Sequence, residues 1–99
     1  MKVVKVSKNK FEIKNIKNTL EIMQAEVGGY IESVRITSNI RLIVDESGIL
    51  MKKPIALDIN GNFIYGDCFF CEISGNKFKG LSAKSLDYVV KNMSIWLKK

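Results

Sequence analysis

The chain has 99 residues, of which 46% are hydrophobic and 26% are charged, and its formal net charge is +6. A chain of this length buries about two thirds of its unfolded surface, so these values predict one globular domain over residues 1–99 and leave no room for a second. No apolar run approaches the ~20 residues that span a bilayer, and the first residues lack the apolar segment of a secretory signal, so we expect a cytoplasmic protein without membrane association.

The start of the chain predicts a β-hairpin followed by a helix. Residues 1–6 and 10–16 are rich in β-branched residues and are joined by short polar residues, as in paired strands. A helix is then expected to begin at Asn18 or Thr19, because both residue types accept a hydrogen bond from the first helical turn.

The end of this helix is marked by two consecutive glycines. Leu20, Met23 and Val27 repeat at helical spacing and predict one buried face. Gly28 falls where a helix closes with a left-handed residue, and Gly29 allows the backbone to turn directly into the next segment. The pair therefore predicts a helix-to-strand corner.

The middle of the chain predicts further strands. Residues 30–36 and 40–46 are β-branched or alternating segments, residues 49–57 form a weaker extended segment with the only proline, and residues 62–74 read as one long strand with Gly66 as a bulge. Turn residues separate these segments. Counting the hairpin, four or five strands are therefore expected before residue 62, and the long strand follows them.

The C-terminal segment predicts the second helix. Ser82 is the expected N-cap, and Leu81 and Leu86 occupy the positions of a hydrophobic staple. An apolar stripe follows at helical spacing, formed by Leu86, Val89, Val90, Met93 and Leu97. Together these elements predict an α+β fold, with a mostly antiparallel five- to six-stranded sheet and two helices packed on one face.

The positive charge is concentrated at the two ends of the chain. Residues 1–17 carry +5, residues 18–76 carry −4 and residues 77–99 carry +5. These ends leave open a nucleic-acid-binding role, with Tyr88 and Trp96 either stacking on bases or packing in the core or a subunit contact. The lysines singled out for that role are Lys91, Lys98 and Lys99. The alternative is that the lysines only keep the protein soluble.

The sequence offers no recognisable catalytic machinery. The absence of histidine excludes Ser-His-Asp and Cys-His catalysis, and neither glycine-rich phosphate fingerprint is present. Cys68 and Cys71 would point to opposite faces of a strand, too far apart for a disulfide, so they are expected to be buried packing residues. We therefore expect a protein that is not an enzyme and that needs no metal or cofactor.

Binding candidates gather around the glycine corner and one acidic turn. A strand that leaves two glycines exposes its first side chains, Tyr30 and Glu32, beside backbone N–H groups. Asp45 and Glu46 either bind a partner or only serve turn chemistry. Tyr30 could alternatively pack on the first helix, with Glu32 solvated. The candidate ligand- or partner-binding residues are Gly28, Gly29, Tyr30, Glu32, Asp45 and Glu46.

The glycine corner is also the part of the chain that most specifically resembles a known family. Across nearly its whole length the chain resembles a family of small uncharacterised domains of phages, plasmids and other mobile elements. The most specific part is an LxxxQxxVGGYIE pattern, formed by Leu20, Gln24, Val27, Gly28, Gly29, Tyr30, Ile31 and Glu32. Residues 50–60 depart from the family's usual Leu-Pro-x-Asn type of segment, so no family site on that loop carries over.

The resemblance implies an α+β fold and a mobile-element setting, and it supplies no catalytic residue. We expect a non-enzymatic binding protein, such as a counter-defence factor that captures a host defence protein or a nucleotide-like signal. The alternatives are a nucleic-acid-binding accessory protein that uses the lysine-rich ends, and an assembly module that forms a homodimer through its helix stripe or a sheet edge.

Overall fold

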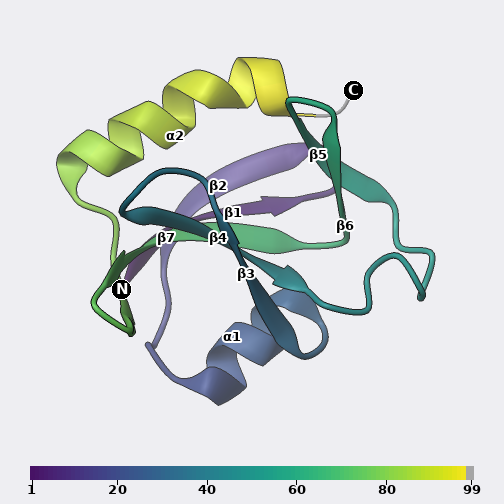
Figure 1. Cartoon of the computed structure of the whole chain (residues 1–99), viewed down its shortest axis with the longest axis horizontal. Coiled ribbons are helices and arrows are strands. Elements are labelled where there is room, and N and C mark those ends of the chain that lie inside the picture. The colour runs from purple at the N-terminus through teal and green to yellow at the C-terminus, as the bar shows by residue number, and fades with distance from the viewer. Residues whose placement is uncertain (98–99) are drawn as a thin grey trace.

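The computed structural model describes residues 1–97 (Figure 1). Ten elements follow one another along the chain: β1 (Lys2–Ser7), β2 (Lys10–Asn15), α1 (Leu20–Val27), β3 (Ile31–Arg35), β4 (Ile40–Asp45), β5 (Ile55–Ile59), β6 (Asn62–Tyr65), β7 (Cys68–Ser74), β8 (Lys77–Lys79) and α2 (Ala83–Trp96). No helix within residues 1–97 is long and apolar enough to cross a membrane.

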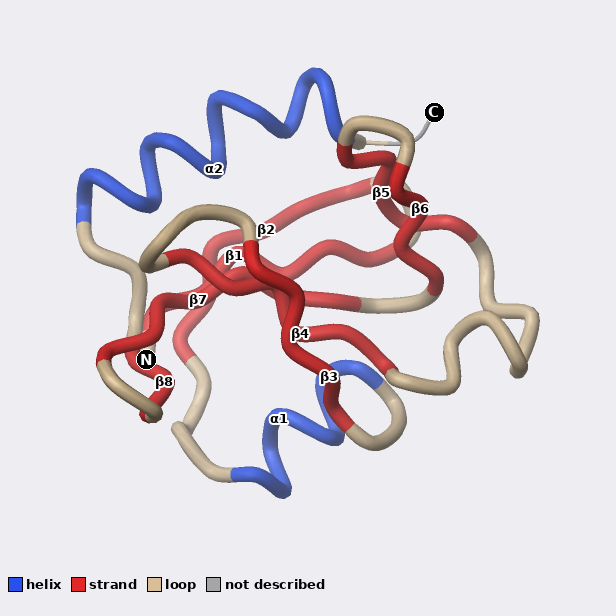
Figure 2. Tube along the Cα trace, in the orientation of Figure 1, coloured by secondary structure: helices blue, strands red, loops and turns tan. Residues whose placement is uncertain are grey.

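One antiparallel sheet forms the centre of the molecule. Its strand order is β2-β1-β7-β4-β3, and β8 adds a sixth strand by pairing with β7. β5 and β6 form a separate two-stranded sheet (Figure 2). The predicted α+β class, with two helices and a mostly antiparallel sheet, is therefore confirmed.

The helices lie on opposite faces of this sheet, rather than on one face as predicted (Figure 1). Val4 and Phe70 pack in the core cluster under α2, whereas their chain neighbours Val3 and Phe69 pack in the cluster under α1. Successive residues of a strand point to opposite faces, so a run of buried residues needs cover on both sides. Each helix supplies that cover for one face.

Helix α1 begins and ends as the sequence predicts. The Thr19 hydroxyl accepts a hydrogen bond from the backbone N–H of Ile22 at 3.2 Å, and Gly28 closes the helix in the left-handed region with φ of 77°. Met23 and Val27 are buried, whereas Leu20 is 55% exposed. The helix therefore covers the sheet with Met23 and Val27, one turn apart, while its first residue stays exposed.

Helix α2 is anchored at both ends. Ser82 caps it by accepting a hydrogen bond from the backbone N–H of Ser85, and the Ser82 backbone N–H donates to the buried carboxylate of Glu72 at 2.7 Å. Near the other end, Trp96 stacks on Phe70 with ring centroids 5.6 Å apart. Trp96 is 5% exposed, so it is a core residue and offers no stacking surface for bases.

Two predicted strands are corrected by the structure. Residues 62–74 form two strands in different sheets, because Gly66 takes a φ of 86° and its N–H bonds the Pro54 carbonyl, which turns the chain from β6 into β7. Residues 49–53 form a loop, and only Ile55–Ile59 of the predicted extended segment is a strand. The lone proline lies between the loop and the strand.

Candidate functional site

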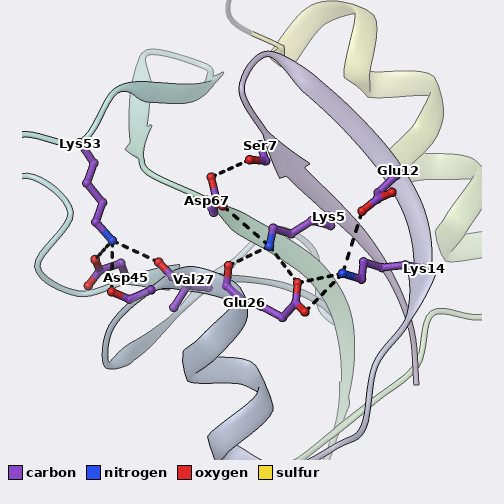
Figure 3. A network of polar contacts seen from close by, with 10 residues as sticks. Lys5, Ser7, Glu12, Lys14, Glu26, Val27, Asp45, Lys53 and Asp67 are labelled. Carbon is purple, nitrogen blue, oxygen red and sulfur yellow. Dashed lines mark hydrogen bonds and ion pairs between the residues drawn. The ribbon is translucent and has the colours of Figure 1, made fainter.

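An ion pair between a buried carboxylate and a partly exposed lysine holds the glycine corner together. The Asp45 carboxylate, at the end of β4, is 2% exposed and lies 2.5 Å from the ammonium of Lys53. The Lys53 Nζ also donates to the carbonyls of Val27 and Gly28, at 3.2 and 3.3 Å (Figure 3). We call this arrangement of Asp45, Lys53 and the end of α1 the Asp45–Lys53 brace. It ties three separate segments of the chain to one another.

Gly29 is required by the close approach of this carboxylate. A Cβ atom at position 29 would lie 2.5 Å from Asp45 Oδ1 and 2.8 Å from Cγ, both closer than real Cβ contacts allow. Glycine is therefore required at the two positions for different reasons. Residue 28 adopts the left-handed conformation, and residue 29 has no room for a Cβ atom beside Asp45.

The surroundings of the brace stabilise both of its charged groups, the Asp45 carboxylate and the Lys53 ammonium. Burial raises the pKa of Asp45, but the hydrogen bonds from Lys53 and from the Ser47 backbone N–H outweigh burial, and the pKa falls below its ordinary value. The Lys53 ammonium meets the carbonyls at the C-terminus of α1, where a helix carries partial negative charge. Asp45 is therefore an ionised structural group.

The residues that follow Asp45 form an ordered loop, which we call the apolar loop and define as residues 46–52. Its last residue, Lys52, is left-handed with φ of 54°. The backbone closes in the pattern of a helix C-terminus. The bonds run from Met51 N–H to the Ser47 carbonyl, from Lys52 N–H to the Ile49 carbonyl and from Lys53 N–H to the Gly48 carbonyl, at 2.9 to 3.0 Å.

The tip of this loop is unusually apolar for an exposed segment. Ile49, Leu50 and Met51 are 69%, 83% and 68% exposed. The loop projects from the side of the molecule, away from both helices (Figures 1 and 2). Tyr30 is 71% exposed, and its carbonyl accepts a hydrogen bond from the Glu46 N–H at 3.0 Å, which joins the corner to the loop.

The apolar tip was missed by sequence reasoning, which interpreted these residues as part of a weak strand. A signal was present, because three consecutive apolar residues stand between Gly48 and Lys52 without the alternation of a half-buried strand. Exposure, however, depends on tertiary packing and could not be read from the pattern.

The six predicted binding residues fall into two groups. Gly28, Gly29 and Asp45 build the brace, and Asp45 is buried. Tyr30, Glu32 and Glu46 are exposed, so the alternative in which Tyr30 packs on the helix is not observed. A recess of about 130 Å³ beside the loop is lined by Glu32, Val34, Val44, Asp45, Glu46, Gly48, Ile49, Phe63, Ile64 and Tyr65.

A larger cavity of about 360 Å³ lies on the other side of the brace. It is bounded by the end of α1, the β1–β2 turn and the segments that enter β5 and β7. Its apolar lining includes Ala25, Val27, Pro54, Ile55 and Ala56, and its charged residues are Lys8, Glu26, Lys53 and Asp67.

An ion-pair network joins Glu26 and Asp67, which line this cavity, to lysines of the β1–β2 hairpin (Figure 3). Lys5 Nζ lies 2.8 Å from the Glu26 carboxylate, Lys14 lies 3.3 Å from it, and the Ser7 hydroxyl donates to Asp67 at 2.9 Å. Burial raises the pKa of Glu26, but the two lysines outweigh burial and lower it. The carboxylates are thus already paired with lysines of the same chain.

Three described lysines of the basic ends lie on two different faces of the sheet. Lys5 and Lys14 meet Glu26 of α1, whereas Lys91 lies on α2, across the sheet, and pairs with Asp87 at 3.0 Å. Lys98 and Lys99, also predicted for nucleic-acid binding, lie outside the described residues.

The two cysteines are free and buried, as predicted, and lie in the clusters on opposite faces of the sheet. Burial raises the pKa of the Cys71 thiol to about 12 and that of Cys68 still further. Thiols that stay protonated at neutral pH are poor nucleophiles, so both act here as small apolar side chains.

These features define a small α+β domain that presents an apolar loop braced by an ion pair. The chain belongs to the family described as a domain of unknown function, DUF3846, which matches residues 1–94. The predicted resemblance to a family of uncharacterised domains is confirmed at this level. No curated protein and no solved structure matches the chain.

Proposed function

We propose that the protein is a non-enzymatic binding protein that captures a second protein through the apolar loop. The observation that carries this proposal is the exposure of three consecutive side chains, Ile49, Leu50 and Met51, on a backbone fixed by its own hydrogen bonds. Contiguous apolar groups on the surface of a soluble domain mark interaction sites more often than singly exposed ones do.

Preorganisation supports the same role. Binding through a mobile loop loses affinity because the loop must be ordered first. Here the Asp45–Lys53 brace fixes the residues before and after the loop, and three backbone hydrogen bonds fix its tip. The loop therefore loses little conformational freedom when it binds a partner.

The surroundings of the loop indicate the chemistry of the partner. Tyr30 adds an exposed aromatic ring, a residue type enriched at binding hot spots. Glu32 and Glu46 line the recess beside Ile49 and make that side acidic. We propose a folded partner with an apolar depression bordered by basic residues.

The resemblance to mobile-element domains supports a counter-defence role, with a host defence protein as the partner. A nucleotide-like signal is less well supported, because Glu26 and Lys53, which line the larger cavity, are already paired with residues of the same chain. A nucleic-acid role is less well supported, because Lys5 and Lys14 pair with Glu26, and Lys91, on the other face of the sheet, pairs with Asp87.

The proposal is tested by matched aspartate substitutions. Leu50 on the loop and Ile95 on α2 are both strongly exposed, at 83% and 72%. Tagged full-length protein is photo-crosslinked in bacterial cells and then purified. The unsubstituted chain and Ile95→Asp are expected to yield the same cross-linked partner protein. Leu50→Asp is expected to lose it, and Tyr30→Ala to weaken it. Retention by Leu50→Asp in a folded protein would contradict the proposal.

A further inference from the structure

Strand β2 is an open edge of the main sheet. It ends the strand order, and among residues 1–97 it pairs only with β1. Five of its six residues are exposed, including Phe11 at 39% and Ile13 at 51%. An edge of this kind has unpaired backbone N–H and C=O groups that can add another strand.

The hairpin turn determines which backbone groups face outward. Lys8 and Asn9 form a two-residue turn with φ of 52° and 63°, so Ser7 and Lys10 form its hydrogen-bonded pair. Hydrogen-bonded residues alternate along an antiparallel pair. The backbone groups of Phe11, Ile13 and Asn15 consequently point away from β1.

The side chains of β2 are divided by face. Phe11 and Ile13 stand opposite Val6 and Val4, which lie in the core cluster under α2, so both are on the α2 face. Lys10, Glu12 and Lys14 alternate in sign on the α1 face. A strand with this alternation can be complementary to a second copy of itself.

We propose that β2 pairs in antiparallel register with β2 of a second copy of this chain, with Ile13 opposite Ile13. Glu12 of each copy then faces Lys14 of the other, which gives two ion pairs, and Phe11 faces Asn15. The outward backbone groups of residues 11, 13 and 15 all find partners within the strand. Opposite charges that face each other across two strands stabilise the pair.

The neighbouring registers are less favourable. With Glu12 opposite Glu12, Lys10 would face Lys14, so every charged pair would be repulsive. With Phe11 opposite Phe11, Ile13 would face Asn9, which is left-handed in the turn and cannot extend the strand. Of these three registers, only the one with Ile13 opposite Ile13 pairs opposite charges and keeps the left-handed turn residues out of the pairing.

The pairing leaves the apolar loop accessible. β2 and β3 are at opposite edges of the sheet, and the loop follows β4, next to β3. The dimer would present two loops and bind bivalently to a partner that carries two sites. The pairing itself does not depend on the proposed function.

The register is tested by three single cysteine substitutions in the full-length protein, under mild oxidation. Ile13→Cys is expected to form a disulfide-linked dimer, because directly opposed residues have Cα atoms about 5.5 Å apart. Glu12→Cys and Phe11→Cys are expected to cross-link weakly, since their copies lie on a diagonal or further away. The native thiols are buried and do not compete. Preferential cross-linking at position 11 or 12 would overturn the register.

The charge pairing is tested by sedimentation over a wide concentration range. Glu12→Lys replaces two attractions by two repulsions and is expected to raise the dimer dissociation constant about tenfold or more. Lys10→Glu, which faces no charged residue in this register, is the matched control and is expected not to weaken the dimer. A monomer mass at all concentrations, or equal weakening by both variants, would overturn the proposal. Circular dichroism of each variant serves as the control for folding.

Discussion

Two buried carboxylates, Glu72 beside the start of α2 and Asp45 beside the end of α1, are kept ionised by different groups. Each belongs to a residue that is at most 6% exposed. Glu72 accepts hydrogen bonds from the Ser82 N–H and from nearby hydroxyl and amide groups, and its nearest cation, Lys79, is 3.9 Å away and largely exposed. Asp45 depends on Lys53.

The helix ends explain the difference. Glu72 lies at a helix N-terminus, where free N–H groups and partial positive charge favour an anion. Asp45 lies near a helix C-terminus, where carbonyls disfavour one. Lys53 resolves this conflict because its ammonium lies between the Asp45 carboxylate and the carbonyls of α1. The first site fixes one helix, whereas the second joins three segments and supports a loop.

The largest expected effect is at Glu72. Burial raises its pKa, but the hydrogen bonds from Ser82, Ser85 and Asn39 outweigh burial and lower it from 4.5 to about 2. A lowered pKa stabilises the fold fully above the unfolded value of 4.5, and this stabilisation is lost as the pH falls toward 2. Glu72→Gln is therefore expected to lower the free energy of unfolding at pH 7 by about 3 kcal/mol, measured by urea denaturation.

The pH dependence provides the control for that prediction. The unsubstituted protein is expected to lose stability between pH 4.5 and pH 2, and Glu72→Gln is expected to lose less over the same range. Asp45 and Glu26, whose pKa values are also lowered, account for the remaining slope. Parallel pH profiles for the two proteins would show that Glu72 is not held in its ionised form.

The second effect is at Lys53. Lys53→Met leaves the Asp45 carboxylate buried without its cation and removes two hydrogen bonds to α1. The expected loss is about 2 kcal/mol, below the range for a fully buried pair because the lysine is 26% exposed. Adding Asp45→Asn to Lys53→Met should cost less than the sum of the single changes, which a double-mutant cycle measures. Strict additivity would contradict a coupled brace.

The smallest of the three effects is at Gly29. Gly29→Ala is expected to displace the Asp45 carboxylate and to destabilise the fold by about 1 kcal/mol, because its Cβ meets a side chain that can shift slightly. In the Asp45→Ala background, which removes the carboxylate, the same substitution should be nearly neutral. If Gly29→Ala still lowered the free energy of unfolding by about 1 kcal/mol in that background, the contact with Asp45 would not be the cause of the loss.

The helix boundaries could be predicted from the sequence because their signals are local. Thr19, Gly28 and Ser82 cap the helices through residues that are three or four positions away in the chain. The division of the helices between two faces also left a signal, the unbroken apolar run of residues 68–71. A strand that carries such a run is buried on both sides, so each face of the sheet needs its own cover.

The brace could not be predicted in the same way. Asp45 and Gly29 could be identified as special positions, but Lys53 lies in a loop, and its contact with α1 spans 26 residues. Periodicity carries no information about such a contact. Tyr30, Glu32 and Glu46 were found as exposed candidates, whereas the apolar tip depends on how the loop folds back on itself.

The Asp45–Lys53 brace is expected to hold the apolar loop in the conformation that the loop presents to a partner. Hydrogen exchange of the amides of Met51, Lys52 and Lys53, each bonded within the loop, tests this directly. In Lys53→Met these amides are expected to exchange about tenfold faster or more, while amides of β1 and β7 accelerate only as the lower global stability requires. Unchanged exchange in the loop would contradict the claim.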